Sequence, residues 1–337
     1  MVADVTIGAR STKGVAMPLQ RGHVRRIGPI MLPSTHPSIG TNINGPALIS
    51  VPPWLPDPLG RYYLYFADHK GSYIRLAYAD HVAGPYTVHP AGSLQLADSC
   101  FPTTAPQGIT VTSPIQQAAI EAEGYDAHFT PHIASPDVVV DHERQTIFMA
   151  FHGLCEDGAQ LTRMAQSADG VSFTAHQPLV AFPYLRILPQ RWKGYWLAMS
   201  MPGIFYRSTD LLSWEAGAIL FANDFRHCAL LRRGDTLYVY WTRVGDTPEH
   251  ILRSTIDLSS GWDGWLNWAP SSPQSVLLPE LPWEGADLPL KASARGQVTA
   301  PVRQLRDPAI LEDEGRVWLL YAVAGESGIA IAELQAD

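Results

Sequence analysis

Residues 306–326 read RDPAILEDEGRVWLLYAVAGE and contain the structural unit that repeats along the chain. A short apolar run, DPAIL at 307–311, is followed after a charged, Gly-containing turn by a longer apolar and aromatic run, GRVWLLYAVAGE at 315–326. Runs of this length, rich in β-branched and aromatic residues and bounded by turn residues, predict β-strands. The stretch therefore predicts two consecutive strands.

The same pair of strands recurs four more times. The longer members are RYYLYFADHKG (61–71), QTIFMAFHGL (145–154), KGYWLAMSM (193–201) and DTLYVYWTRVGD (235–246). The shorter members that precede them are PALIS (46–50), PDVVV (136–140), LRIL (185–188) and HCALL (227–231). Most pairs are followed by a third strand and a turn, and the turns SADGVSF and STDLLSW are near-copies. Such a repeat predicts an all-β, five-bladed β-propeller; a β-sandwich array or two β domains are the alternatives.

The predicted organisation is a single domain over 1–337. The blades are expected at 44–90, 135–178, 184–220, 226–280 and 305–335, with long insertions at 91–134 and 262–304. The last blade lacks sequence for a fourth strand. We expect a strand within HVRRIGPIML, residues 23–32, to close the ring there.

Composition narrows the class of protein. Of 337 residues, 46% are hydrophobic and 17% charged, which indicates a buried core. The net charge of −8, with no basic run beyond two residues, argues against nucleic-acid binding. No apolar run has the length of a membrane span, and the N-terminus lacks a secretory pattern, so a cytoplasmic location is expected unless a signal peptide was trimmed. The three cysteines are widely spaced and fit no disulfide framework.

The predicted topology nominates a site. In an up-and-down propeller, the starts of the inner strands and the loops between second and third strands share one face, which we call the mouth. Ionisable and polar residues recur at these positions: Asn44, Asp68, His69, Asp137, His152, Tyr184, Arg186, Arg226, His227, Arg243, Arg306, Asp307 and Glu326. Because a buried charge is costly unless it is paired or solvated, a ring of such groups predicts a polar pocket.

The five-fold pattern, SPDVVV in blade two and RDP in blade five resemble the furanosidase-type propellers of glycoside hydrolase family 43 and its relatives, families 32, 62, 68 and 117. The resemblance covers 45–335 and implies carboxylates at inner-strand starts. In family 43 an Asp-Pro in blade one provides the base, an Ala-Pro-Asp in blade two the orienting Asp, and a Glu-Gly-Pro the acid. Asp137 matches the orienting position, but Gly45 stands at the base position, and blades three and four have no Glu-Gly-Pro.

Four residues are candidates for the chemistry. Asp307 resembles the family 32 Asp that binds sugar hydroxyls and is either a base or a strand-entry residue paired with Arg306. Asp137 is a site carboxylate or a turn cap, and Glu326 is an acid, if burial raises its pKa, or a solvated turn residue. His227 is a candidate acid/base, as a counterpart of the family 117 His, or a channel residue bonded to a carbonyl.

The remaining candidates are substrate contacts. Arg186, Arg226, Arg243 and Arg306 at one mouth favour an anionic ligand, with salt bridges inside the ring, such as Arg306–Asp137, as the alternative. The histidines are His69, His132 and His152, and the candidates for stacking on sugar are Tyr184 and the loop residues Trp54 and Trp283. No metal-binding spacing is present and no cofactor is expected, although a single structural ion in the channel is left open.

Three functions follow. The first is a glycoside hydrolase that removes a furanose or acidic terminal sugar from a small oligosaccharide. The second is a lyase in which His227 or Tyr184 abstracts a proton from a uronate neutralised by arginine. The third is a propeller that binds carbohydrate without catalysis. Gly45 at the base position favours the second and third over a standard family 43 enzyme. The oligomeric state is not predicted.

Overall fold

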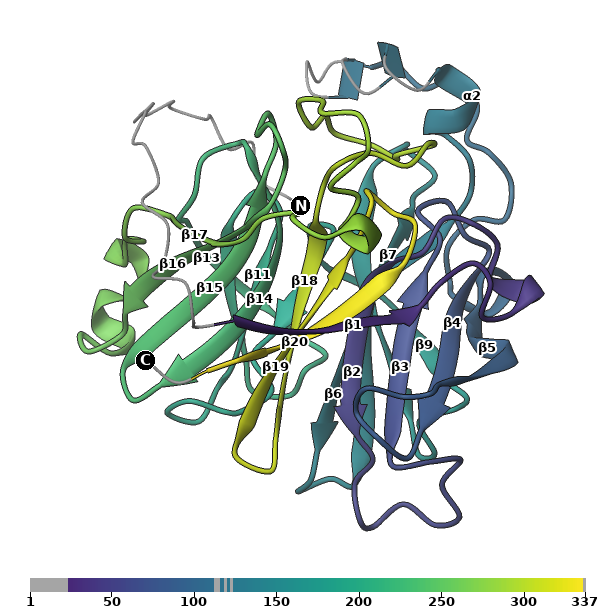
Figure 1. Cartoon of the computed structure of the whole chain (residues 1–337). Helices are drawn as coiled ribbons and strands as arrows, with labels where there is room; N and C mark the ends of the chain where they lie inside the picture. The colour runs from purple at the N-terminus through teal and green to yellow at the C-terminus, as the bar shows by residue number, and fades with distance from the viewer. Residues whose placement is uncertain (1–23, 112–115, 118–119, 122–123, 336–337) are drawn as a thin grey trace.

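The computed structural model describes residues 24–111, 116–117, 120–121 and 124–335. In this part of the chain the strands form five four-stranded antiparallel sheets (Figure 1). The prediction of an all-β, five-bladed propeller is confirmed. None of the helices among these residues is long and apolar enough to cross a bilayer.

In blades one to four the strands follow chain order from the inner to the outer strand. Blade one holds β2 (Asn44–Ser50), β3 (Tyr62–Ala67), β4 (Tyr73–Ala79) and β5 (Thr87–Gln95). Blade two holds β6 (Ile133–Asp141), β7 (Thr146–Leu154), β8 (Gln160–Ser167) and β9 (Thr174–Ala181). Blade three holds β10 (Arg186–Ile187), β11 (Trp196–Ser200), β12 (Ile204–Ser208) and β13 (Glu215–Ile219). Blade four holds β14 (Phe225–Arg233), β15 (Thr236–Arg243), β16 (Ile251–Asp257) and β17 (Gln274–Leu277).

Blade five joins the two ends of the chain. Its strands are β18 (Arg306–Asp313), β19 (Arg316–Ala322), β20 (Ile329–Leu334) and, outermost, β1 (Val24–Met31). In the antiparallel β1–β20 pair, Val24 lies opposite Leu334 and Met31 opposite Ile329. The expected closure by a strand within 23–32 is confirmed, with residue 23 itself outside the described residues. The last repeat supplies only three strands, and β1 pairs with β20 so that the outer edge of β20 is not left unpaired.

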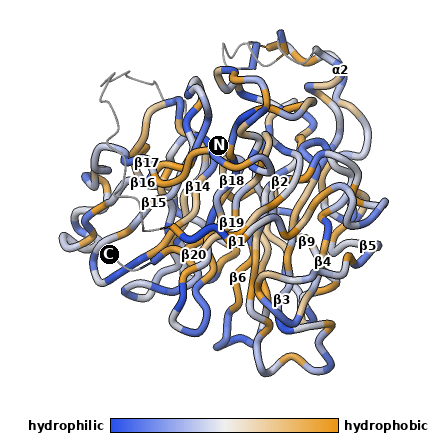
Figure 2. The backbone as a smooth tube through the Cα atoms, in the orientation of Figure 1, coloured by the Kyte–Doolittle hydropathy of each residue, from blue (hydrophilic) through white to orange (hydrophobic). Residues whose placement is uncertain are grey.

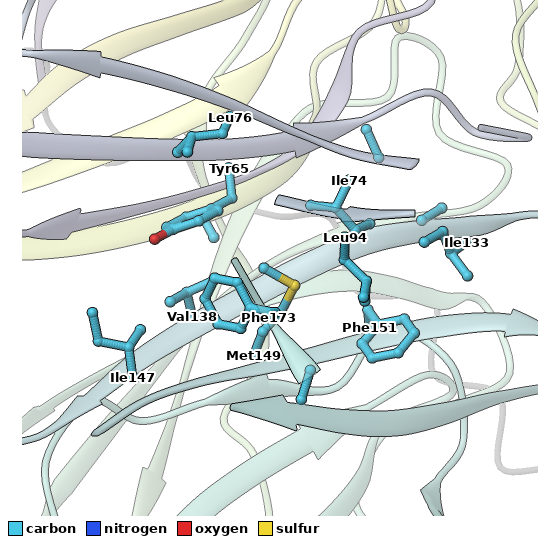
Figure 3. Packing of buried hydrophobic residues seen from close by; sticks show 14 of the residues in the cluster. Tyr65, Ile74, Leu76, Leu94, Ile133, Val138, Ile147, Met149, Phe151 and Phe173 are labelled. Carbon is cyan, nitrogen blue, oxygen red and sulfur yellow. The ribbon is translucent and has the colours of Figure 1, made fainter. Parts of the chain in front are cut away.

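The buried apolar side chains lie in the interfaces between neighbouring blades. Each neighbouring pair of blades, including five with one, encloses a cluster of buried apolar side chains. Figure 3 shows the cluster between blades one and two, where Tyr65 and Leu76 face Val138 and Met149. Figure 2 shows the apolar stretches concentrated in the strands and the hydrophilic stretches in the turns. Because inner strands are buried on both faces, they read as continuous apolar runs.

The near-identical turns of blades two and three adopt the same hydrogen-bonded structure. The Asp169 carboxylate accepts from the backbone N–H groups of Val171 and Ser172, as Asp210 does from the two equivalent residues of its own turn. These donors hold the pKa of both carboxylates below the ordinary value although burial alone raises it. The two turns thus share a sequence because each needs an Asp whose carboxylate accepts hydrogen bonds from backbone N–H groups of the same turn.

Short helices lie in the connections: η1 (Pro37–Ile39), η2 (Leu96–Asp98), α2 (Tyr125–His128), η3 (Trp262–Asn267) and η4 (Pro282–Glu284). The segment that carries α2 and the yellow-green segment between β17 and β18 both lie at the top of Figure 1. The second of these crosses the mouth and takes part in the site.

Candidate active site

The inner strands begin with a break in strand pairing. Register shifts fall between Asn44 and Ala47, Ala134 and Asp137, Phe225 and Cys228, and Arg306 and Ala309. The backbone is left-handed at Gly45, Ser135, Tyr184 and Asp307, with φ between 48° and 63°. Non-glycine residues adopt this conformation at a cost, and such strain is concentrated at functional sites. Bulges thus lie at the starts of four of the five inner strands, a position where bulges change the direction of side chains next to active sites.

Gly45 marks the clearest departure from the pattern of family 43. A Cβ atom placed on Gly45 would lie 3.0 Å from the Ser135 Cα atom, and φ at Gly45 is +59°. The backbones of blades one and two thus meet where that family places its base. The Gly45 N–H instead donates to the Asp307 carboxylate over 3.3 Å.

Asp307 and His227 form a buried pair at the mouth. The His227 Nδ1 atom lies 2.5 Å from Asp307 Oδ1, and the two side chains are only 2–3% exposed. Burial lowers the pKa of His227 despite the opposing effect of Asp307, so its imidazole is neutral near pH 7. Burial raises the pKa of Asp307, but His227 and Arg226 lower it below the ordinary value. The carboxylate beside Nδ1 favours the tautomer with its proton on Nδ1 and a lone pair on Nε2, and neither ring nitrogen has a hydrogen bond of good geometry among the described residues.

An aromatic row extends from this pair across blades three and two. The centroid of the Tyr184 ring lies 4.5 Å from the centroid of the His227 ring and 4.5 Å from that of the His152 ring. The centroids of the His152 and His132 rings lie 5.9 Å apart. Burial raises the pKa of Tyr184, so its hydroxyl keeps its proton. His132 Nδ1 lies 2.7 Å from the Thr130 carbonyl. Four residues predicted as site residues are thus brought together.

A network of buried charges lies on the other side of His227. Glu249 Oε2 is 3.4 Å from Arg226 Nη1 and 3.0 Å from Arg306 Nε. Arg306 also donates to Glu326 Oε1 over 2.8 Å and to the Gln304 side chain over 2.7 Å. Since these side chains are buried, each guanidinium needs the carboxylates beside it.

Glu326 does not meet the condition attached to its role as an acid, namely a pKa that burial raises above the ordinary value. Its carboxylate accepts from Arg306 and Asn42 over 2.8 Å, and from Asn44 over 3.3 Å, and it lies 3.3 Å from His69 Nδ1. Burial raises its pKa, but His69 and the arginines hold it far below the ordinary value. An acid that stays ionised has no proton to give at neutral pH.

Asp137 directly follows the bulge at 135–136 in the inner strand of blade two. Asp137 accepts from the Ile187 N–H over 2.6 Å and from Arg186 over 3.3 Å, and it lines a channel cavity of about 300 Å³ with Ala47 and Ala309. Burial raises its pKa despite Arg186. Asp137 is thus paired with Arg186 and Arg306 with two glutamates, so the alternative of an Arg306–Asp137 bridge is wrong, whereas the catalytic pairing of Asp137 with Asp307 stays a prediction.

The four arginines predicted to bind an anion already have partners. Arg186 also donates to the carbonyls of Pro46 and Pro136, and Arg243 donates to Asp246 over 2.8 Å. Arg226 and Arg306 are paired with glutamates as described. These salt bridges remove the reason for inferring an anionic ligand from these four residues.

The other predicted contacts lie at the rim or elsewhere. Asp68 caps its own turn through the Lys70 N–H, and its carboxylate lies 3.5 Å from Arg75. Trp54 follows β2, at the end of the inner strand remote from the mouth, and packs against the core between blades one and two. Trp283 packs against the core between blades four and five. Both tryptophans thus pack against the core as partly buried residues, and their assignment as sugar contacts stays a prediction.

The segment between β17 and β18 closes over the mouth. Arg226 donates to the carbonyls of Ala294 and Gly296 over 2.7 and 2.9 Å. Asn42 donates to the Val298 carbonyl over 3.4 Å, and the Val298 N–H donates to Glu326 over 3.4 Å. Residues 294–298 are thus held by the same charges that form the network.

Sequence reasoning missed Glu249, Asn42, Gln304 and Arg295. Glu249 lies in the loop between β15 and β16 from which Arg243 was chosen, so its position was an available signal. Gln304 and Arg295 lie in an irregular insertion, where no periodicity identifies the side chains that face the mouth. Over the described residues, no group of three or more His, Cys, Asp or Glu side chains could hold a metal ion.

No family model matches the chain. Among solved structures, similar folds include a family 43 β-xylosidase/α-arabinofuranosidase from a compost microbial metagenome (12% identity, TM-score 0.57, covering 93% of this chain and 96% of that one). A family 43 enzyme of Xanthomonas citri (13%, 0.57, 93% and 91%) and a glycoside hydrolase, named as putative, of Parabacteroides distasonis (10%, 0.58, 94% and 95%) are similar too. At these identities the similarity establishes the shared propeller fold.

A closer relative is uncharacterized protein R118 of Acanthamoeba polyphaga mimivirus. It is 34% identical over 319 residues, which cover 87% of this chain and 83% of the relative. The chain belongs to the same protein family as mimivirus R118, and this family has the five-bladed propeller fold of the family 43 glycoside hydrolases.

Proposed function

We propose that the protein is a glycoside hydrolase whose proton transfer is carried out by His227, supported by Asp307, at the mouth of the propeller. The observation that carries the proposal is the 2.5 Å contact between His227 Nδ1 and Asp307 Oδ1, in a ring whose Nε2 atom has no hydrogen-bond partner among the described residues. A carboxylate that holds Nδ1–H fixes the tautomer and stabilises the imidazolium formed when Nε2 takes up a proton. The solved enzymes of the same fold that are named as a xylosidase or arabinofuranosidase support hydrolysis.

In this proposal His227 Nε2 accepts the proton of the attacking water as the water oxygen forms its bond to the anomeric carbon. The glycosidic bond breaks in the same step, and the departing sugar oxygen takes a proton from solvent. Asp307 then faces an imidazolium, and its negative charge offsets the positive charge as it develops. Tyr184 keeps its proton and donates a hydrogen bond to a sugar oxygen. The base that family 43 places in blade one would thus be replaced by a His–Asp pair from blades four and five.

The contact between Tyr184 and His227 favours a second candidate, a uronate lyase. Their ring centroids lie 4.5 Å apart, so the two candidate proton carriers are neighbours at the mouth. Here His227 would abstract the proton α to the uronate carboxyl group, and the bond to the leaving sugar would break by elimination.

The test is incubation of the protein with neutral arabino- and xylo-oligosaccharides and with oligouronates, followed by chromatography of the products. Hydrolysis yields saturated sugars, whereas elimination yields an unsaturated uronate with ultraviolet absorbance. A product that disappears with Asp307→Asn supports the assignment. The absence of product from every substrate refutes catalysis and leaves the carbohydrate-binding propeller.

A further inference from the structure

Arg295 differs from every arginine nominated from the sequence. Its guanidinium contacts the Met201 sulfur, at 3.1 Å, and the Asn223 carbonyl. Among the described residues no carboxylate lies within ion-pair distance of Arg295. By contrast Arg186, Arg226, Arg243 and Arg306 each have a carboxylate within 3.4 Å.

The position of Arg295 is fixed by the site itself. Arg226 holds the carbonyls on both sides of it, those of Ala294 and Gly296, through its two terminal nitrogens. From there the Arg295 side chain reaches Met201, in the turn between β11 and β12, and Asn223, just before β14. Tyr184 and His227 begin the inner strands of these same two blades, so Arg295 bridges the blades that provide the proposed reacting groups.

The positive charge of Arg295 is not neutralised by any carboxylate at ion-pair distance among the described residues. Partial burial and the nearby Arg226 charge both lower the pKa of Arg295, with smaller opposite effects from Tyr184 and Asp224. Glu249 is shared by Arg226 and Arg306 and Glu326 is bonded to Arg306, so neither is free to pair with it. A planar guanidinium in this state binds a carboxylate through two parallel hydrogen bonds.

We propose that Arg295 is a specificity-determining residue that binds the carboxylate of an acidic sugar, so that the ligand at the mouth is a uronate. The proposal rests on the proposed function only in placing a sugar at the mouth. The sequence predicted an anionic ligand from four other arginines that proved to be paired with carboxylates. Here the same class of ligand is inferred from Arg295, which was not among them. Met201 and Asn223 offer no competing negative charge, and a uronate carboxylate would supply the missing partner.

The test compares one sugar with and without its charge. Digalacturonate, diglucuronate and dimannuronate are each offered to the Asp307→Asn protein as the free acid and as the methyl ester, and binding is measured by calorimetry. Asp307→Asn prevents turnover and leaves Arg295 in place. We expect at least one free acid to bind tenfold or more tightly than its ester, the effect of a charge-assisted bidentate contact.

Variants of Arg295 show whether this residue causes the tighter binding of the free acid over the ester. Arg295→Met in the same background should reduce the acid-to-ester ratio tenfold or more, and Arg295→Lys should restore part of it. Arg232→Met is the matched control, because Arg232 also lacks an ion pair among the described residues and donates to a carbonyl, that of Gly234, at the opposite end of blade four. The control should keep the full ratio, and thermal unfolding shows whether each variant is folded.

The outcomes separate this proposal from the proposed function. Equal binding of acid and ester, no binding of any uronate, or an unchanged ratio in Arg295→Met overturns the role of Arg295. In those cases hydrolysis of neutral sugars by the wild-type protein would still support the proposed function. Acid-selective binding that depends on Arg295, with no product from any substrate, would support Arg295 and refute catalysis.

Discussion

Replacing Gly45 with alanine tests why the blade-one base is missing. The backbone at Gly45 is left-handed, with φ +59°, and a new Cβ would lie 3.0 Å from Ser135 Cα and 3.4 Å from Ser135 Oγ. The left-handed conformation costs a residue with a Cβ about 1–2 kcal/mol. Overpacking against the neighbouring backbone adds roughly 1–3 kcal/mol. We therefore expect Gly45→Ala to lower the free energy of unfolding by about 2–5 kcal/mol.

Gly234→Ala separates the two contributions. Gly234 has nearly the same φ, +57°, but nothing lies within 4 Å of a Cβ added there. Its replacement should cost only the conformational part, about 1–2 kcal/mol. Both variants are measured by denaturant unfolding against the wild-type protein. Equal losses in the two variants would refute the close approach of blades one and two at Gly45.

The remaining predictions concern the charged network. Glu326 has a depressed pKa in the folded protein, so it contributes stability that is present above its unfolded pKa and lost as the pH falls below about 4.3. Glu326→Gln should therefore be destabilised at pH 7, and its deficit should shrink on acidification; a constant deficit would contradict the pairing. Glu249→Ala should cost about 3–5 kcal/mol because it leaves buried guanidiniums without a partner. Glu280→Ala, at an exposed carboxylate 3.1 Å from Arg26, should cost less than about 1 kcal/mol in the same unfolding assay, and equal costs would rule out a special role for the network.

The fold was predictable because the repeat is carried by strand patterns that depend on local chemistry. Continuous apolar runs such as GRVWLLYAVAGE identify strands buried on both faces, and the incomplete last repeat calls for a strand from elsewhere. The up-and-down course of the chain then places His227, Asp307 and Tyr184 at one end. These inferences use alternation, length and connectivity, which a single sequence contains.

The roles of individual residues were less predictable because small shifts decide them. A one-residue bulge lies between Ala134 and Asp137 and changes which side chains face the channel, and the sequence SPD does not reveal it. Arginines and carboxylates at one mouth were identified, but which of them pair depends on distances between blades. The pKa of Glu326 follows from that pairing, and Arg295 lies in an insertion without periodicity.

The most direct test of the account is the rate of product formation by His227→Gln on a sugar that the wild-type protein converts. Glutamine preserves polarity and approximate size but has no basic nitrogen, so a role in proton transfer predicts a fall in kcat of roughly 10²–10⁴-fold. Thermal unfolding verifies that the variant is folded. A folded His227→Gln protein that turns over at the wild-type rate would contradict the central claim that the His227–Asp307 pair performs the chemistry.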